Sequence, residues 1–282
     1  RTQILQQRDQ PVAMAGLAFP AIVMGSQHPY GRPPNGTEAS TALLSRDRVN
    51  QFYQTHYRPG NAKLLVVGDI TLAEAQQLVT ARFGVWERGT TPPAAPAAAT
   101  IAPPARTFYL VDKPGAAQSV IRIGNVGVPR STADFFPLQV MNTILGGSFT
   151  SRLNQNLRET HGYTYGVSSL FAMRRMAGPF QARSSVQAAK TDSALIEFLR
   201  EMRRIRDEAV PQTELDKAKA YLALGLPGDF ETTQGAAGQF PSLLTFGLPL
   251  DYYNSYVARI NAVTAADVQR VARLYLDVDR FT

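Results

Sequence analysis

Arg158 and Tyr165 could meet where a helix ends and a strand begins, and both side chains carry hydrogen-bond donors. They stand seven positions apart, with His161 and Gly162 between them. A guanidinium and a phenol can both donate hydrogen bonds to a carbonyl oxygen, and a phenol can stabilise an oxyanion as negative charge develops. Placed side by side, the pair could hold a substrate at one of its carbonyl groups.

Both residues also have an ordinary structural interpretation. An arginine near a helix end is commonly solvated or complements the helix dipole, so Arg158 need not bind anything. Strand alternation would place Tyr165 with Val167 and Phe171 on a largely apolar face, as expected of a core tyrosine. The two residues alone leave both interpretations open.

Residues that bind metals are sparse in this chain. It contains no cysteine and three histidines, His28, His56 and His161, no two of which lie within four residues of each other. Two histidines four apart on a helix share one face and can bind one metal, and no such pair exists here. His28 stands beside Pro29 in a loop, which favours a packing or turn residue. No residue of this chain is assigned to a metal.

The elements around Arg158 and Tyr165 are predicted from apolar periodicity. Leu153 and Leu157 share one helical face, Gly162 stands where a left-handed helix cap is needed, and an aromatic strand follows. Strands are predicted at 63–67, 107–111, 119–125, 163–173 and 178–186, the last two as a hairpin. Helices are predicted at 46–57, 72–83, 133–145 and around Leu195, Leu199 and Met202.

The formal net charge of +7 raises the question of nucleic-acid binding. The densest group of arginines, at 200–206, shares its helix with acidic residues over 197–208, as on a solvated and ion-paired face. Nucleic acid is therefore not an expected partner. No run of about 18 apolar residues occurs either, so no membrane span is predicted.

A Pro/Ala-rich linker at 89–106 divides the chain. Residues 90–105 carry five prolines and no charge, which is typical of an extended, semi-rigid segment. Only one clear strand precedes it, which is too little sheet for an independent domain. We therefore expect 1–88 to be the C-terminal part of a first domain and 107–282 to be a second domain.

A weak internal repeat supports this plan of two related domains. Residues 45–49 and 264–268 both begin a capped helix that leads toward a strand. In the first copy the strand follows at 64–67, whereas the second copy reaches Thr282 where such a strand would begin. The chain is expected to hold the later part of one α/β repeat and nearly all of a second.

The passage from Ser148 to Tyr165 has the order small-x-x-S-R-L-x-x-x-L-R-E-x-x-G-aromatic-x-Y. In this form it resembles the second-domain signature of the insulinase/pitrilysin family of zinc metallopeptidases, which includes the mitochondrial processing peptidase. A second set of residues agrees in kind and order: His-Pro-Tyr-Gly at 28–31, Pro-Gly-Asn at 59–61 and Val-Gly-Asp at 67–69. The resemblance covers most of residues 10–280.

The resemblance implies a fold, an activity and two residue roles. The fold would be α+β, with two related domains, each a mixed or mainly antiparallel sheet with helices packed on it, and with the first domain incomplete. The parent protein would be a zinc metalloendopeptidase that cleaves peptides in a chamber between two domains. The family's arginine and tyrosine that help to hold the bound peptide correspond to Arg158 and Tyr165.

The H-x-x-E-H zinc motif of that family is absent from this chain. In the motif two histidines bind the metal and the glutamate activates water. Two explanations stay open: the motif stands upstream of Arg1, or the chain is a non-catalytic subunit beside a zinc-bearing one. Zinc is thus expected in the full-length protein or a partner subunit, and this chain alone should bind none and be inactive.

Partners and location also follow from the resemblance. A peptide substrate is expected, together with a homodimer or a heterodimer that includes a zinc-bearing subunit. The alternative of a different class is a non-enzymatic scaffold subunit that presents a peptide-binding surface. The linker composition and the habit of the family suggest the periplasm or envelope of a bacterium.

Overall fold

The computed structural model describes residues 2–87, 89 and 106–282. The predicted linker at 89–106 therefore lies almost wholly outside the described residues. Two compact units are present: the larger comprises 1–35, 98–224 and 251–282, and the smaller comprises 36–97 and 225–250. The division of the chain into parts of two domains, at 1–88 and 107–282, remains a prediction.

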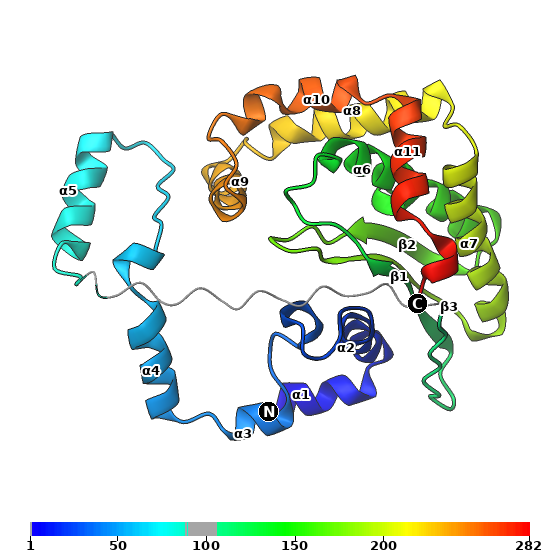
Figure 1. Ribbon diagram of the computed structural model, residues 1–282, viewed down its shortest axis with the longest axis horizontal. Helices are drawn as coiled ribbons and strands as arrows, with labels where there is room; N and C mark the ends of the chain where they lie inside the picture. Colours follow the sequence, from blue (N-terminus) through cyan, green and yellow to red (C-terminus); the bar gives the residue numbers. More distant parts are fainter. Residues whose placement is uncertain (1, 88, 90–105) are drawn as a thin grey trace. The chain divides into compact units, whose positions relative to one another are not determined.

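An antiparallel sheet forms the centre of the larger unit (Figure 1). Strands β2 (Thr164–Phe171) and β3 (Pro179–Gln187) form the predicted hairpin, and β1 (Gln118–Val126) pairs with the other edge of β3. Along β3, Phe180 and Ala182 are buried whereas Arg183 is exposed, because successive side chains of a strand point to opposite faces. One face of the sheet therefore lies against the core.

The larger unit also contains most of the helical residues. Its helices are α1 (Thr2–Gln6), α2 (Pro11–Met24), α6 (Phe135–Asn142), α7 (Thr191–Asp207), most of α8 (Gln212–Gly228), α10 (Tyr256–Ala262), α11 (Ala265–Tyr275) and the π-helical segments η4 (Thr143–Gly147) and η5 (Asn154–Thr160).

Helices cover both faces of the sheet. On the core face, α6, α7 and α11 bury Leu138, Phe198 and Val271 completely. On the opposite face, α2 packs through Phe19 and Val23 against Val126 of β1. This arrangement confirms the predicted α+β class, with helices packed on a mainly antiparallel sheet.

The smaller unit is described by helices α3 (Glu38–Ala42), α4 (Arg46–His56), α5 (Leu72–Phe83) and α9 (Thr233–Phe246). Helices α4 and α5 confirm the predictions at 46–57 and 72–83. Ser45 accepts a hydrogen bond from the Arg48 backbone N–H, which caps α4, and Thr71 caps α5 in the same way. Within the described residues no helix is long and apolar enough to cross a bilayer.

The predicted strands at 63–67 and 107–111 are wrong. Neither stretch is a strand, and their apolar side chains face solvent, with Leu64 60% exposed and Leu110 94% exposed. A strand needs a partner to pair its backbone groups. The described part of the smaller unit contains no strand, and no ladder joins 107–111 to β1. Hydrophobic content alone does not make a strand where no neighbour is available.

Thr282 exchanges two backbone hydrogen bonds with Gly124 on the outer edge of β1, at N–O distances of 2.8 and 2.9 Å. Reciprocal bonds between two residues are the pattern of antiparallel pairing. The internal repeat predicts the start of a strand at this point, and the pairing agrees with that prediction.

Candidate functional site

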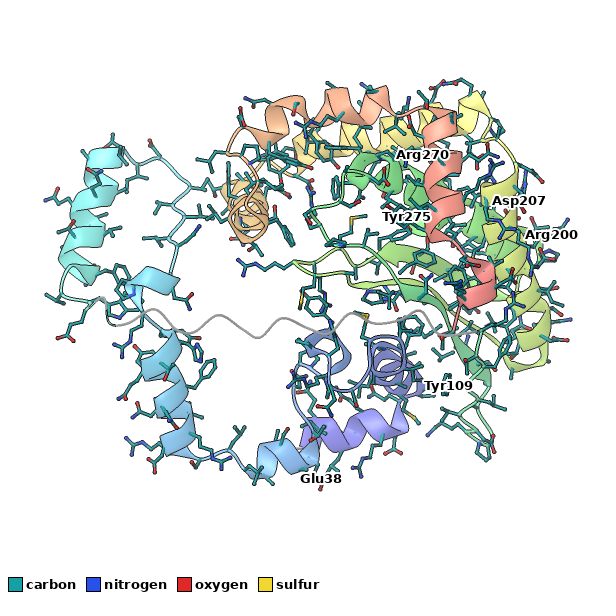
Figure 2. The ribbon with its side chains drawn as sticks, in the orientation of Figure 1. Glu38, Tyr109, Arg200, Asp207, Arg270 and Tyr275 are labelled. Carbon is teal, nitrogen blue, oxygen red and sulfur yellow. The ribbon has the colours of Figure 1, made fainter. Side chains whose placement is uncertain are left out.

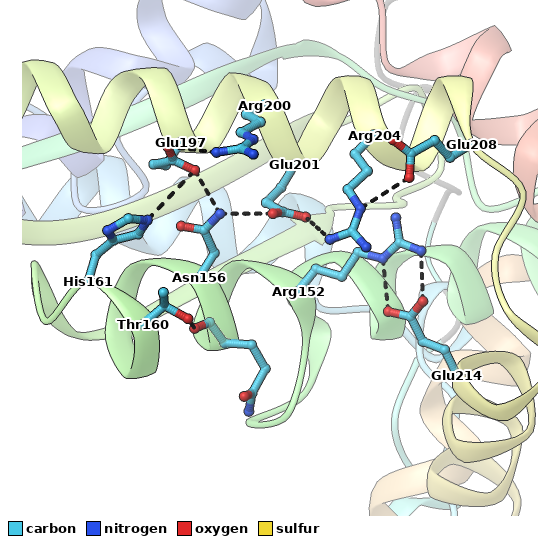
Figure 3. A network of polar contacts seen from close by, with 11 residues as sticks. Arg152, Asn156, Thr160, His161, Glu197, Arg200, Glu201, Arg204, Glu208 and Glu214 are labelled. Carbon is cyan, nitrogen blue, oxygen red and sulfur yellow. Dashed lines mark hydrogen bonds and ion pairs between the residues drawn. The ribbon is translucent and has the colours of Figure 1, made fainter.

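The segment that carries Arg158 is fixed to its neighbours by a polar network (Figure 3). Arg152, just before η5, donates from Nε and Nη2 to the two carboxylate oxygens of Glu214 at 2.8 and 2.7 Å. Within η5, Asn156 Nδ2 donates to Glu197 and Glu201 of α7, each at 2.8 Å. A buried bidentate ion pair and a shared amide restrict how η5 can move. Arg158 therefore stands on a well-held backbone.

The Arg158 side chain is half-buried and retains free donor capacity. Its guanidinium carbon lies 4.3 Å from the centroid of the Phe149 ring, in a cation–π contact. Nη1 lies 3.5 Å from Glu159 Oε1, yet it is enclosed and has no hydrogen-bond acceptor among the described residues. A buried donor without an acceptor is uncommon in a folded protein. The contacts with Phe149 and Glu159 hold the guanidinium near the end of η5.

Gly162 ends η5 as predicted. Its φ of +63° is left-handed, its N–H donates to the Arg158 carbonyl at 3.1 Å, and the Tyr163 N–H donates to the Leu157 carbonyl at 2.9 Å. Glycine adopts this conformation without the steric cost that a Cβ brings. The turn places Arg158 and Tyr165 on either side of a tight helix-to-strand junction.

Tyr165 points into solvent, with 92% of its surface exposed. The pairing of β2 with β3 shifts between Thr164, opposite Val186, and Val167, opposite Ser184. Tyr165 and Gly166 thus lie together opposite Ser185, which is a β-bulge. The interpretation of Tyr165 as a core residue is wrong, because the bulge breaks the alternation on which it depends.

Asn154 joins the two halves of the site, and the sequence analysis did not identify it. Its Oδ1 accepts from the Val167 N–H at 3.1 Å, and its Nδ2 donates to the Val167 carbonyl at 2.9 Å. Asn154 is buried between Leu153 and Leu157 on the apolar side of its helix. A polar residue in that position was the available signal, since a buried amide needs partners.

The three histidines form no metal site among the described residues, and each makes another contact. His28 Nδ1 accepts from the Tyr30 N–H at 3.1 Å, so it is a turn residue as predicted. The His56 ring contacts Phe52, and the His161 ring stacks on Tyr163 with centroids 4.9 Å apart. No group of three His, Cys, Asp or Glu side chains within the described residues could hold a metal ion. The donor set of this part of the chain does not fit zinc.

Comparison with protein families gives a match over residues 43–222 to the model described as the peptidase M16 inactive domain. An uncharacterized zinc protease of Mycobacterium leprae (strain TN) is 27% identical over 79% of this chain and 50% of its own length. One from Streptomyces coelicolor (strain ATCC BAA-471 / A3(2) / M145) is 27% identical over 90% of this chain and 56% of its own. The chain thus spans about half the length of these curated relatives.

Solved structures share the fold. A peptidase M16 inactive domain from Pseudomonas fluorescens superposes with a TM-score of 0.89 at 24% identity, covering 99% of this chain and 66% of its own. A protease from Helicobacter pylori gives a TM-score of 0.87 at 20% identity, covering 100% of this chain and 68% of its own. At these identities the likeness concerns the fold alone.

Proposed function

This chain belongs to the peptidase M16 family, and from that premise we propose that it supplies the substrate-binding part of a zinc-dependent metalloendopeptidase. The family membership confirms the resemblance to insulinase/pitrilysin peptidases. In the proposal, Arg158 and Tyr165 hold a peptide that is cleaved in a chamber between two domains, and the zinc is bound by another part of the parent protein or by a partner subunit.

One observation carries the proposal: the bulge turns Tyr165 outward beside the junction at which η5, the helix that carries Arg158, ends. A core tyrosine would need no bulge that turns its ring outward, and a freely solvated arginine would not be held by a ring contact. Asn154 ties the two backbones together, so the backbone segments that carry the two side chains keep a fixed relation. Preorganised donors cost little reorganisation when a ligand arrives.

The two side chains would act on the peptide and not on the metal. The Arg158 guanidinium donates to a backbone carbonyl of the substrate and fixes its orientation. The Tyr165 hydroxyl donates to an oxygen on which negative charge develops during hydrolysis, and this contact strengthens toward the transition state. Tyr165 would therefore affect turnover more than binding, and Arg158 would affect both.

A non-catalytic partner or scaffold subunit is the second candidate. It is favoured by the lack of a metal-binding group in the described residues and by the description of the matched family model as an inactive domain. Such a subunit would present the same peptide-binding surface to a zinc-bearing partner in a homodimer or heterodimer. The two candidate functions differ in which polypeptide carries the catalytic residues. Both assign peptide binding to Arg158 and Tyr165.

The test is peptide cleavage by the full-length parent protein, with a chelator and after zinc is restored. Arg158→Ala and Tyr165→Phe should lower kcat/KM at least tenfold, while the free energy of unfolding stays within about 1 kcal/mol, as for surface changes. Matched controls are Arg200→Ala and Tyr221→Phe, whose side chains are exposed on α7 and α8.

Two results would contradict the proposal. Equal loss of stability and activity in Tyr165→Phe would assign the residue a structural role. A parent protein that stays inactive, even with a zinc-bearing partner subunit present, would favour the scaffold candidate.

A further inference from the structure

The bulge in β2 creates a local hydrogen-bonding problem. Two residues, Tyr165 and Gly166, stand opposite the single residue Ser185, so the backbone groups at this point cannot all pair along the ladder. Backbone N–H and C=O groups that are left without partners in a partly buried sheet destabilise it. At this point side-chain hydroxyls reach both polar groups of Gly166 and the carbonyl of Ser185.

Two side-chain hydroxyls form hydrogen bonds with these backbone groups. Thr164 Oγ1 accepts from the Gly166 N–H at 3.1 Å and donates to the Ser185 carbonyl at 2.8 Å. Ser184 Oγ lies 2.8 Å from the Gly166 carbonyl and 2.8 Å from Thr164 Oγ1, so the two hydroxyls also contact each other. Both polar groups of Gly166 and the carbonyl of Ser185 thus have a hydroxyl partner.

Nothing else holds Tyr165. Its ring has no hydrogen bond, ion pair or ring contact with the described residues, and 92% of its surface is exposed. The direction of its Cα–Cβ bond is therefore set by the backbone of the bulge. In a regular strand the same side chain would turn toward the face on which Val167 and Phe171 are buried.

We propose that Thr164 and Ser184 are positioning residues for Tyr165: their hydroxyls hold the bulge that aims the phenol at the bound peptide. The inference rests on the proposed function of Tyr165 and adds two residues to it. Ser184 lies on β3, on a different strand from Tyr165, and it acts through the Gly166 carbonyl and the Thr164 hydroxyl.

The first test is catalytic and uses the full-length parent protein. Thr164→Val and Ser184→Ala should lower kcat about tenfold and change KM less than threefold, because the phenol acts on developing charge. Thr164→Ser keeps a hydroxyl at the same place and should restore kcat to within threefold of the wild type. Ser168→Ala is the control, since it removes a β2 hydroxyl that, among the described residues, bonds only Arg183.

A double-mutant cycle separates positioning from general weakening of the strand. In a Tyr165→Phe background the phenol is already gone, so Ser184→Ala should lower kcat less than twofold further. Independent effects that multiply to the full tenfold would assign Ser184 a merely structural role and overturn the inference.

A structural readout on the present chain completes the test. Amide hydrogen exchange at Gly166 should accelerate at least tenfold in Thr164→Val, which loses the acceptor for that N–H, and should not change in Ser168→Ala. Faster exchange with unchanged kcat, while Tyr165→Phe is impaired, would overturn the inference and leave the proposed function standing. Full activity of Tyr165→Phe itself would remove the proposed function and the inference together.

Discussion

Tyr163 and Tyr165 are two positions apart and have opposite surroundings. Tyr163 is half-buried, packs against the core and stacks on His161, whereas Tyr165 is almost wholly exposed. In a regular strand both would lie on one face. The sequence predicted the strand and the cap at Gly162. It did not predict the bulge, because a bulge adds a residue to the strand without changing the apolar pattern. Gly166 was the one local sign of it, since glycine inside a strand often marks a bulge.

Removing the charge of Glu214 should destabilise the larger unit. The Arg152 side chain is only 5% exposed, and Glu214→Gln removes the carboxylate that pairs with it, so that Glu201 and Glu208 are the acidic groups that still act on its charge. Breaking a buried pair in this way costs about 3–5 kcal/mol, and the partial exposure of Glu214 places the expected loss near about 3 kcal/mol. Urea unfolding measures it. Glu208→Gln breaks the exposed pair with Arg204 and should cost less than about 1 kcal/mol; equal losses would contradict the prediction.

Asp134 should make stability depend on acid pH. Its carboxylate accepts from Arg270 at 2.7 Å and from the Tyr275 hydroxyl at 2.8 Å, both on α11 (Figure 2). The hydrogen bond from Arg270 is the main cause that lowers the pKa of Asp134 in the folded state. Stability from this carboxylate is then fully present above its unfolded pKa of about 3.9 and is lost as the pH falls through the lower, folded pKa.

The measurement compares Asp134→Asn with the wild type at two pH values. The variant should unfold at a lower urea concentration at pH 7, and the difference should shrink as the pH falls from about 4 to about 2. A difference that stays constant over this range would show that Asp134 contributes through packing or through hydrogen bonds that do not depend on its charge.

At the scale of elements, local signals predicted helices better than strands. The bounds of α5 agree with the predicted 72–83 because its cap, its apolar spacing and its end are all encoded within the helix itself. The stretches at 63–67 and 107–111 have equally apolar sequences, yet they form no strands. A strand is completed by a neighbour distant in sequence, and a single sequence does not say whether that neighbour is available.

The cap that ends η5 provides a test at this scale. Gly162→Ala introduces a Cβ at φ +63°, where nothing lies within 4 Å of it, so the expected cost is purely conformational. That cost is about 1–2 kcal/mol. Gly166→Ala also meets no neighbour and has no positive φ, so thermal unfolding should show a loss below about 0.5 kcal/mol. Equal losses would mean that the left-handed turn is not the source of the cost.

For the whole molecule, the sequence predicted the α+β class and the family, and both are confirmed. Its assignment of Arg158 and Tyr165 to substrate binding stays a prediction. The contacts that position these residues could not be predicted from the sequence, because they join distant segments. They are the ladder shift at Tyr165, the hydrogen bonds of the Asn154 amide and the pairing of Arg152 with Glu214. Such contacts leave no periodic trace in the sequence.

The isolated chain should neither bind zinc stoichiometrically nor cleave peptides. Its histidines are dispersed, and the described residues hold no group of three metal-binding side chains. Zinc binding at neutral pH, followed by calorimetry, and peptide cleavage with and without a chelator measure the two properties. Under the proposed function the full-length parent protein is the positive control, and chelator-sensitive cleavage by the isolated chain would contradict this assignment.

The π-helical form of η5 has a consequence for evolution of the gene. A π-helical turn holds one residue more than the α-helical turn it replaces, and such turns are frequent at functional sites. Deleting one codon between those for Leu153 and Leu157 would restore α-helical winding and rotate Arg158 by about 100° about the axis. The length of this segment would then be under selection as strictly as its residues, so insertions and deletions here should be rarer than substitutions.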